Sequence, residues 1–309
     1  MLPVIASSNI SATQYMIVKK VFITAFFGLL QNLAFAQQTI VLPVKGDQAN
    51  PSENKEQTLT PDPKSASRIV FNVTNPSLAI YKPEKNASNG IGVLVCPGGA
   101  FHILAYDDEG VRIAKALTAK GYTAAVLKYR LVPLDPKDPF GKLGQNSKDF
   151  KVLEAIMAPV VPLAIEDGKT AMKYLKDNAN KLGFDAVKVG VIGFSAGGTI
   201  AAAIALDPSP EVRPLFSAPI YPYLGPVLSS ATPTSAPPLF IAVTQDDDFG
   251  FDSNSLKFYA QWKAAKGLAE LHLYTQGHHG FASKKQNLPV DHWMERFTEW
   301  LQSMGYSAK

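Results

Sequence analysis

The stretch VKVGVIGFSAGGTIAAAIAL, residues 187–206, decides the fold. Its first part, 187–194, is an apolar run of the kind that forms a buried β-strand, and its alanine-rich second part, 196–206, reads as an α-helix. The junction GFSAG matches the pattern G-x-S-x-G around Ser195. Because glycines permit a sharp turn, the pattern predicts a strand–turn–helix unit that presents the Ser195 hydroxyl at the N-terminus of a helix.

Strands and helices alternate on both sides of this unit. Strands are expected at 91–95, 123–129, 187–194, 239–243 and 271–274, and helices at 109–120, 163–182, 196–206, 253–266 and 290–304. Buried strands that alternate with helices predict an α/β fold with a mostly parallel sheet covered on both faces. In such sheets the chemistry gathers at the carboxyl ends of the strands. Residues 132–150, rich in proline, glycine and polar side chains, are expected to form a surface excursion.

Composition limits the class of protein. The 309 residues suffice for one large domain, and 46% hydrophobic with 18% charged residues is typical of a soluble globular enzyme. The net charge of +4, without a dense basic block, argues against nucleic-acid binding. Cys96 is the single cysteine, which excludes an intramolecular disulfide and a Cys–His zinc pattern. Cys96 lies in an apolar run and is expected in the core.

Residues 1–36 have the features of a signal peptide. Lys19 and Lys20 precede the apolar run 21–30, and small residues in Ala34-Phe35-Ala36 stand where a signal peptidase cleaves. The run is short for a bilayer, so no stable membrane anchor is expected. We therefore expect export to the periplasm or secretion. The alternatives are a buried N-terminal helix or an uncleaved anchor.

The remaining chain divides in two. Residues 37–66 are polar and contain four prolines, which is typical of a mobile linker or an extended lead-in. Residues 67–309 are expected to form the catalytic domain. The residues before Met16 fit a signal peptide poorly, so Met16 is an alternative start.

A serine hydroxyl becomes a strong nucleophile when a histidine, held by a carboxylate, takes its proton. In this type of fold the order along the chain is Ser, Asp or Glu, then His. Three carboxylates, Asp246, Asp247 and Asp248, follow the expected strand 239–243. After the strand 271–274 come His278 and His279, flanked by glycines. The residues themselves leave the choice open within each group.

Attack on an ester carbonyl also requires hydrogen-bond donors for the developing oxyanion. We expect one donor to be the backbone N–H of Ala196, directly after the nucleophile. A second is expected from the loop PGGAFH, residues 97–102, where Gly99 and Ala100 are the candidates. Three further side chains are expected to line the substrate pocket: Phe101, His102 and Phe194.

Five segments, taken in order, resemble the exported carbohydrate-esterase branch of the α/β-hydrolase superfamily, which includes acetylxylan esterases and feruloyl-esterase-like proteins. The segments are VLVCPGGAFHILAYDDEG (93–110), VLKYRL (126–131), VGVIGFSAGG (189–198), NSLKFY (254–259) and LHLYTQGHHGF (271–281). The resemblance covers roughly residues 68–305. It implies an α/β-hydrolase fold and an esterase that acts without cofactor or metal on a small ester or acylated carbohydrate.

The resemblance also selects within the open groups. In the family pattern the catalytic histidine directly precedes Gly-Phe, which corresponds to His279. The catalytic acid of the pattern lies seven residues before the position of Asn254, which corresponds to Asp247, with Asp246 as the second choice. The chain departs from the pattern where Ala100 replaces a third glycine and where Gly250-Phe251 replaces Val-Pro. The segment 132–160 is longer than the pattern, in a region where substrate selectivity is often set.

Two other functions fit parts of this pattern. A serine exopeptidase or a lipase-like carboxylesterase uses the same three residues, although a peptidase of this type carries a large additional domain. A non-catalytic exported binding protein on the same scaffold is the alternative of another class, and a complete Ser, Asp and His set argues against it. The oligomeric state is left open by the sequence.

Overall fold

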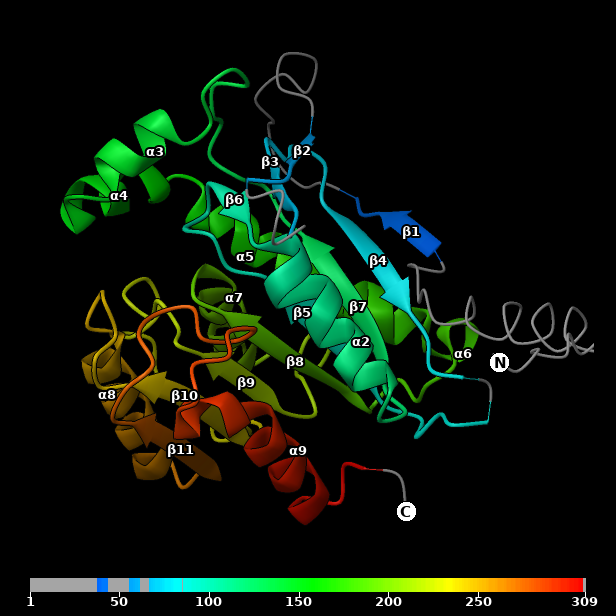
Figure 1. Ribbon diagram of the computed structural model, residues 1–309. Coiled ribbons are helices and arrows are strands. Elements are labelled where there is room, and N and C mark those ends of the chain that lie inside the picture. The colour runs from blue at the N-terminus through cyan, green and yellow to red at the C-terminus, as the bar shows by residue number, and fades with distance from the viewer. Residues whose placement is uncertain (1–37, 44–55, 62–66, 85, 308–309) are drawn as a thin grey trace, which may run out of the picture. The chain divides into compact units, whose positions relative to one another are not determined.

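The computed structural model describes residues 38–43, 56–61, 67–84 and 86–307. The expected signal peptide at 1–36 lies outside the described residues. A central eight-stranded sheet runs through the structure (Figure 1). In spatial order its strands are β1 (Gln38–Val41), β4 (Ser77–Tyr81), β7 (Thr123–Lys128), β5 (Gly92–Cys96), β8 (Val189–Phe194), β9 (Ser217–Ile220), β10 (Leu239–Thr244) and β11 (Ala269–Tyr274).

The sheet is mostly parallel, as the sequence predicts. In the spatial order, every neighbouring pair from β7 through β5 to β11 is parallel. Strand β4 pairs antiparallel with both β7 and β1. Strands β5, β8, β9 and β10 are buried along their whole length, which explains their continuous apolar character. Cys96, at the end of β5, is fully buried, as expected.

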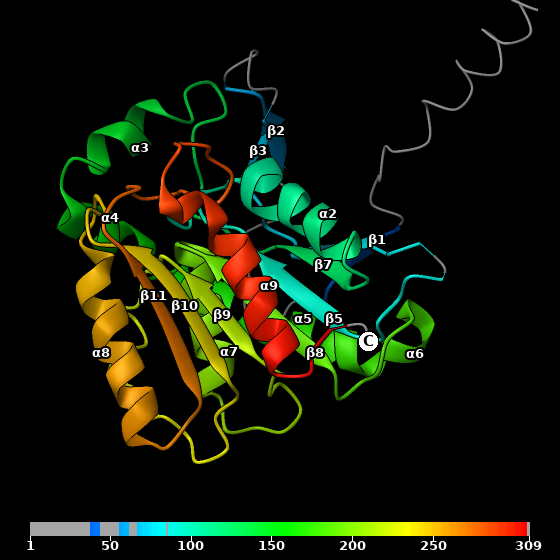
Figure 2. The same ribbon diagram turned by 60° about the horizontal axis from the view of Figure 1, so that its bottom comes forward.

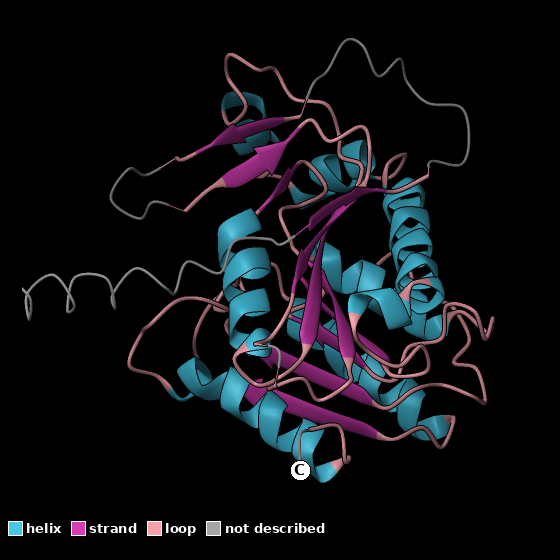
Figure 3. Cartoon of the chain, turned by 90° about the vertical axis from the view of Figure 1, so that its right-hand side faces the viewer, coloured by secondary structure: helices cyan, strands magenta, loops and turns pink. Residues whose placement is uncertain are grey.

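Helices cover both faces of the sheet (Figures 1 and 3). The helical segments are η1 (Tyr106–Val111), α2 (Arg112–Thr118), α3 (Gly141–Asn146), α4 (Phe150–Met157), α5 (Val161–Asp177), α6 (Ala179–Leu182), α7 (Ala196–Leu206), α8 (Phe251–Ala264), η2 (Pro289–His292) and α9 (Trp293–Ser303). Figure 2 shows α2 and α9 on the near face, whereas α5, α7 and α8 lie on the other. Every residue of α7 is buried, so this apolar helix lies at the centre of its layer.

Part of the expected lead-in belongs to the folded domain. Strand β1 lies in the central sheet, and β2 (Gln57–Leu59) forms a small antiparallel sheet with β3 (Ile69–Phe71) and β6 (Ile103–Leu104). The sequence placed the start of the domain at residue 67, whereas the structure includes these two strands of region 37–66. Their polar residues are tolerated because β1 is an edge strand with mostly exposed side chains.

The expected surface excursion, 132–150, contains helix α3, and helix α4 begins at its last residue. Helix α4 presents Phe150, Leu153 and Met157 on one face, at the i, i+3 and i+7 spacing of an amphipathic helix. Phe150 packs against Phe249 and Phe251 in the segment that follows β10. This contact brings α4 to the carboxyl ends of the strands. Across the described part of the chain, no helix combines the length and apolar character needed to span a bilayer.

Candidate active site

Ser195 occupies a sharp turn between β8 and α7. Its backbone has φ 50° and ψ −114°, a conformation that is rare for a residue with a side chain. The flanking glycines are needed because the backbones approach closely. A Cβ at Gly193 would lie 2.1 Å from the Gly197 carbonyl oxygen, and a Cβ at Gly197 would lie 2.0 Å from the Cys96 carbonyl oxygen. The predicted strand–turn–helix unit is therefore present.

Ser195, His279 and Asp247 meet at the carboxyl ends of three strands. The Nε2 atom of His279 lies 2.9 Å from Ser195 Oγ, and its Nδ1 atom lies 2.8 Å from Asp247 Oδ2. A carboxylate only accepts hydrogen bonds, so Nδ1 carries the proton and Nε2 is free to accept the serine proton. The geometry fixes the tautomer that a general base needs.

Asp247 is held rigidly and away from solvent. Its side chain is 0% exposed, and its Oδ1 accepts hydrogen bonds from the backbone N–H groups of Phe249 at 3.0 Å and Phe251 at 3.3 Å. These bonds fix the carboxylate while Oδ2 faces the imidazole. A fixed carboxylate orients the ring without competition from water.

The neighbouring aspartates bond to the histidine loop instead. Asp246 accepts from the backbone N–H groups of Gly277 at 3.1 Å and His278 at 2.9 Å. Asp248 accepts from the His279 N–H at 3.1 Å and contacts the His278 ring. The His278 side chain is 63% exposed. Three carboxylates thus hold one loop, and Asp247 is the one in contact with the His279 ring.

Aromatic side chains surround the His279 ring. The ring centroids of Phe249, Tyr221 and Phe251 lie 4.8, 4.9 and 5.3 Å from that of His279, all in edge-to-face arrangements. The imidazole is therefore positioned by packing as well as by Asp247.

The loop after β5 turns with unusual backbone angles. Ala100 and Phe101 have φ angles of 51° and 54°, so the alanine that departs from the family pattern does adopt the left-handed conformation. His102 Nδ1 lies 2.6 Å from the Ala100 carbonyl oxygen, to which it must donate. The buried Nε2 of His102 has no hydrogen-bond partner among the described residues, and burial lowers the pKa of this histidine.

The Gly98 N–H of this loop is already engaged. It donates to Oε2 of the buried Glu109 at 2.6 Å, and the Tyr221 hydroxyl donates to Glu109 Oε1 at 2.7 Å. Burial raises the pKa of Glu109, whereas these two bonds and the charge of His279 act in the opposite direction. With Gly98 occupied, Gly99 and Ala100 remain the candidate donors of the loop, close to Ala196.

The three expected pocket residues lie elsewhere. Phe101 and Phe194 are 0% exposed and His102 is 1% exposed. The Phe101 ring packs on Tyr129, and the Phe194 ring packs on Trp293 of α9. This prediction was wrong because these side chains complete the core around the strands. Neither the adjacency of Phe194 to Ser195 nor the position of Phe101 and His102 in the oxyanion loop brings the side chains to the open side of Ser195.

The cavity beside Ser195 is small and apolar, with a volume of about 30 Å³. It is lined by Ala100, Phe150, Leu153, Met157, Ser195, Ala196, Tyr223, Phe249 and Phe251. Most of this lining was not anticipated from the sequence. The helical spacing of apolar residues in 150–157 and the Phe-Gly-Phe triplet at 249–251 were signals that could have identified part of it.

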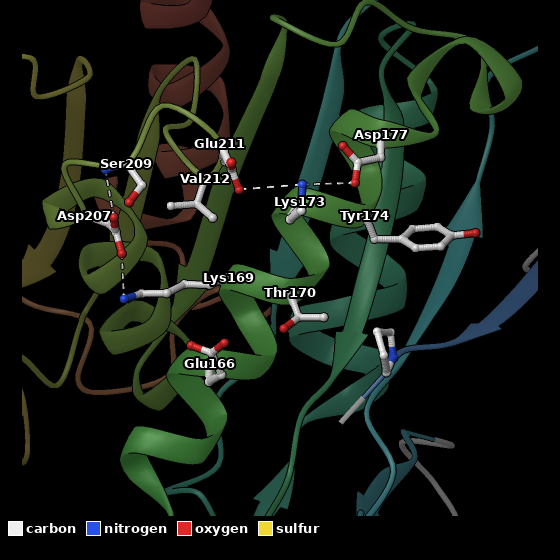
Figure 4. A pocket seen from close by; sticks show the side chains of 11 residues that line it. Glu166, Lys169, Thr170, Lys173, Tyr174, Asp177, Asp207, Ser209, Glu211 and Val212 are labelled. Atoms are coloured by element: carbon white, nitrogen blue, oxygen red, sulfur yellow. Dashed lines mark hydrogen bonds and ion pairs between the residues drawn. The ribbon is translucent and has the colours of Figure 1, made fainter. Parts of the chain in front are cut away.

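A larger hollow of about 400 Å³ lies along α5 (Figure 4). Most of its charged side chains pair with each other: Lys169 with Asp207, and Lys173 with Asp177 and Glu211. Asp207 follows the C-terminus of α7 and Ser195 precedes its N-terminus, so roughly 16 Å of helix separates the two. The hollow is therefore distinct from the candidate site. In the described segments, no group of three or more His, Cys, Asp or Glu residues is arranged to hold a metal ion.

Known proteins resemble this chain in sequence and in fold. The BD-FAE family model matches residues 149–213, which include α4 and Ser195. An acetylxylan esterase of Xylanibacter ruminicola is 23% identical over 279 residues, covering 80% of this chain and 52% of that protein. The chain thus spans about half the length of the curated relative it matches.

Among solved structures, an acetyl ester-xyloside bifunctional hydrolase from Caldicellulosiruptor lactoaceticus has a TM-score of 0.62 at 21% identity, covering 90% of this chain and 100% of the other. A carboxylesterase from Lactobacillus plantarum has a TM-score of 0.58 at 20% identity, covering 83% and 99%. Esterase 2 of Thermogutta terrifontis, phosphorylated by paraoxon, has a TM-score of 0.59 at 21% identity, covering 77% and 92%. The chain therefore has the α/β-hydrolase fold, and its similarities lie in an esterase branch of that superfamily.

Proposed function

We propose that this protein is an exported serine carboxylic-ester hydrolase that removes acetyl or other small acyl groups from polysaccharide. The observation that carries the proposal is the continuous hydrogen-bonded line from Ser195 Oγ through His279 to the buried Asp247. The similarity to an acetylxylan esterase supports the glycan part, and the signal-peptide features of residues 1–36 support export.

In the first half of the reaction, Ser195 Oγ attacks the acyl carbon while His279 Nε2 takes the hydroxyl proton. Asp247 holds the ring and stabilises the imidazolium that forms. The backbone N–H of Ala196 and that of Gly99 or Ala100 would stabilise the negative charge on the carbonyl oxygen. His279 then donates its proton to the leaving sugar oxygen, which leaves an acyl-Ser195 intermediate.

In the second half, His279 takes a proton from water, and the hydroxide equivalent attacks the acyl carbon. Collapse of the tetrahedral intermediate breaks the bond to Ser195 Oγ, which recovers its proton from His279, and the carboxylic acid is released. None of these steps uses a metal or a cofactor.

The size of the cavity supports a short acyl group. A space of about 30 Å³ holds roughly two water-sized groups, which matches the methyl of an acetyl group or the ethyl of a propionyl group. Its lining is almost entirely apolar, so a charged acyl chain would lose its hydration there without compensation.

The first experiment measures hydrolysis of p-nitrophenyl acetate by the purified protein and by Ser195→Ala. The wild type should turn over and the variant should lose at least about 10³-fold in kcat. Equal activity of both proteins would overturn the proposal, and a folded but inactive wild type would favour the non-catalytic binding protein.

The second experiment addresses the substrate. Acetate release from acetylated xylan and other acetylated glycans should exceed the release of longer acids from matched esters. Preferred cleavage of long-chain esters would favour a lipase-like carboxylesterase, and preferred cleavage of peptide p-nitroanilides would favour an exopeptidase. Localisation of the mature protein in the periplasm or the medium would test export.

A further inference from the structure

Glu109 is a buried carboxylate that the steps above do not use. It lies on the π-helical segment η1 (Tyr106–Val111) and is 8% exposed. π-Helical turns are rare and occur often at functional sites. Burial of a carboxylate is costly unless its oxygens are hydrogen-bonded, and here each oxygen accepts a bond from a different part of the candidate active site.

The first bond fixes the oxyanion loop. Oε2 of Glu109 accepts from the Gly98 N–H at 2.6 Å, directly before Gly99 and Ala100. A Cβ at Gly98 would lie 2.7 Å from Glu109 Oε2 and 2.9 Å from Ser195 Cβ. The carboxylate and the nucleophile therefore approach the same side of Gly98. A shift of Glu109 would move this loop relative to Ser195.

The second bond fixes a wall of the histidine site. Oε1 of Glu109 accepts from the Tyr221 hydroxyl at 2.7 Å, and the Tyr221 ring lies edge-on to His279 at 4.9 Å between centroids. Tyr221 has a φ angle of 36° and its N–H donates to the Ala242 carbonyl oxygen at 2.7 Å. Its backbone is thus fixed on β9 and β10, and its side chain is fixed by Glu109.

We infer that Glu109 is a positioning residue. It holds the oxyanion loop in place through Gly98, and it holds the His279 imidazole in place beside Ser195 through Tyr221. The inference rests on the proposed esterase function. Both carboxylate oxygens of Glu109 are engaged in these bonds, so its effect on the chemistry is expected to pass through the two contacts. Because transition-state stabilisation depends on donors and base being placed in advance, losing the contacts should slow the chemical step more than substrate binding.

The test measures kcat and KM on p-nitrophenyl acetate for four single variants, one double variant and the wild type. Glu109→Ala should lower kcat by about 30–100-fold and change KM by less than about threefold, because loss of a directly bonding oxyanion donor costs about 10²–10³-fold. Glu109→Gln should keep kcat within about fivefold of wild type, since its amide oxygen accepts from Gly98 and its NH₂ bonds to the Tyr221 oxygen.

Asp107→Ala is the matched control on the same π-helical segment. Asp107 accepts three hydrogen bonds from Arg68, and among the described residues its side chain forms no hydrogen bond or ion pair with Gly98, Tyr221 or His279. Its removal should lower the melting temperature and leave kcat unchanged. A loss of kcat in Asp107→Ala equal to that in Glu109→Ala would show a general structural effect and overturn the inference.

Tyr221→Phe completes a double-mutant cycle. The substitution should lower kcat in the wild type and have little further effect in Glu109→Ala, because the two residues act through one bond. Additive losses, or no rescue by Glu109→Gln, would contradict the inference. If Glu109→Ala does not fold, the Tyr221→Phe variant tests the inference by itself. A kcat of Tyr221→Phe within about twofold of wild type would then overturn the inference. If the wild type is active and Glu109→Ala has the same kcat, this inference alone is rejected. If the wild type is inactive, the proposed function is rejected as well.

Discussion

The hydroxyl of Tyr223 donates a hydrogen bond of 2.5 Å to Oε1 of Glu154 on α4. The same tyrosine donates its backbone N–H to the Ser195 carbonyl oxygen at 3.1 Å. One residue therefore ties α4 to the turn that carries the candidate nucleophile. Within the segment 132–160, which departs from the family pattern, helix α4 thus forms a fixed wall of the cavity beside Ser195.

The first prediction concerns acyl length. Met157→Ala should enlarge the cavity and raise the ratio of kcat/KM for p-nitrophenyl hexanoate over acetate by about 10-fold or more, because one methylene in an apolar pocket is worth about 10–200-fold. Met157 is 2% exposed, so the substitution should also cost about 2–5 kcal/mol of stability. Kinetics on esters of two to eight carbons check the prediction.

Val152→Ala on the same helix is the control. Val152 is 44% exposed and does not line the cavity, so its loss should leave the chain-length profile unchanged. An unchanged profile in Met157→Ala, with a normal fold by circular dichroism, would mean that α4 does not limit the acyl group.

The second prediction separates the neighbouring aspartates. Asp247→Asn should lower kcat by about 10³–10⁴-fold, since an asparagine amide in place of the carboxylate favours the wrong imidazole tautomer. Asp246→Asn should cost less than about 10-fold, because the asparagine oxygen still accepts from one of the two backbone N–H groups that Asp246 binds, and neither of these bonds involves the His279 ring. Steady-state kinetics on p-nitrophenyl acetate distinguish the two, and an equal loss in both variants would refute the assignment.

Local sequence predicted the parts of the site that depend on local geometry. The turn at Ser195 follows from the glycines around it, whose missing Cβ atoms allow the close approach of neighbouring backbones. The choice between His278 and His279 was different. It depends on a φ angle of 57° at His278 and on bonds to Asp246 and Asp248, which lie about 30 residues away in sequence.

Long-range packing determined what the sequence did not reveal. Strand β9 (Ser217–Ile220) is short and contains Pro219, so it lacks a strand signal, yet pairing with β8 and β10 buries it completely. One wall of the cavity comes from α4, whose apolar face becomes part of the site only by packing against Phe249 and Phe251. The role inferred for Glu109 likewise depends on contacts with distant Tyr221.

The third prediction concerns the alanine in the oxyanion loop. Ala100 has a φ angle of 51°, so Ala100→Gly should remove about 1–2 kcal/mol of left-handed strain, offset by about 0.5–1 kcal/mol of added chain entropy. A net gain of roughly 0.5–1 kcal/mol in unfolding free energy is expected from urea titration. Ala105→Gly, at a φ angle of −70°, should instead destabilise the protein. Destabilisation by both changes would show that Ala100 is not strained.

The fourth prediction concerns acid stability. Partial burial acts to raise the pKa of Asp107, but hydrogen bonds and charge from Arg68 outweigh it and hold this pKa below its usual value. A depressed folded-state pKa contributes stability above the unfolded pKa, about 3.9, and that stability is lost as the pH falls through the folded value. Asp107→Asn should therefore cost on the order of 1 kcal/mol at pH 7, a modest amount because Arg68 is half-exposed.

The difference in unfolding free energy between wild type and Asp107→Asn should shrink as the pH falls below about 4, where Asp107 of the unfolded wild type takes up a proton, and the ionic part should be lost once the pH is below the depressed folded pKa. Urea unfolding at several pH values, followed by tryptophan fluorescence, measures this difference. A gap that stays constant between pH 7 and pH 2 would mean that the stabilisation comes from packing of the Asp107 side chain, independent of its charge, because only the ionic part of the Arg68 contact disappears on protonation.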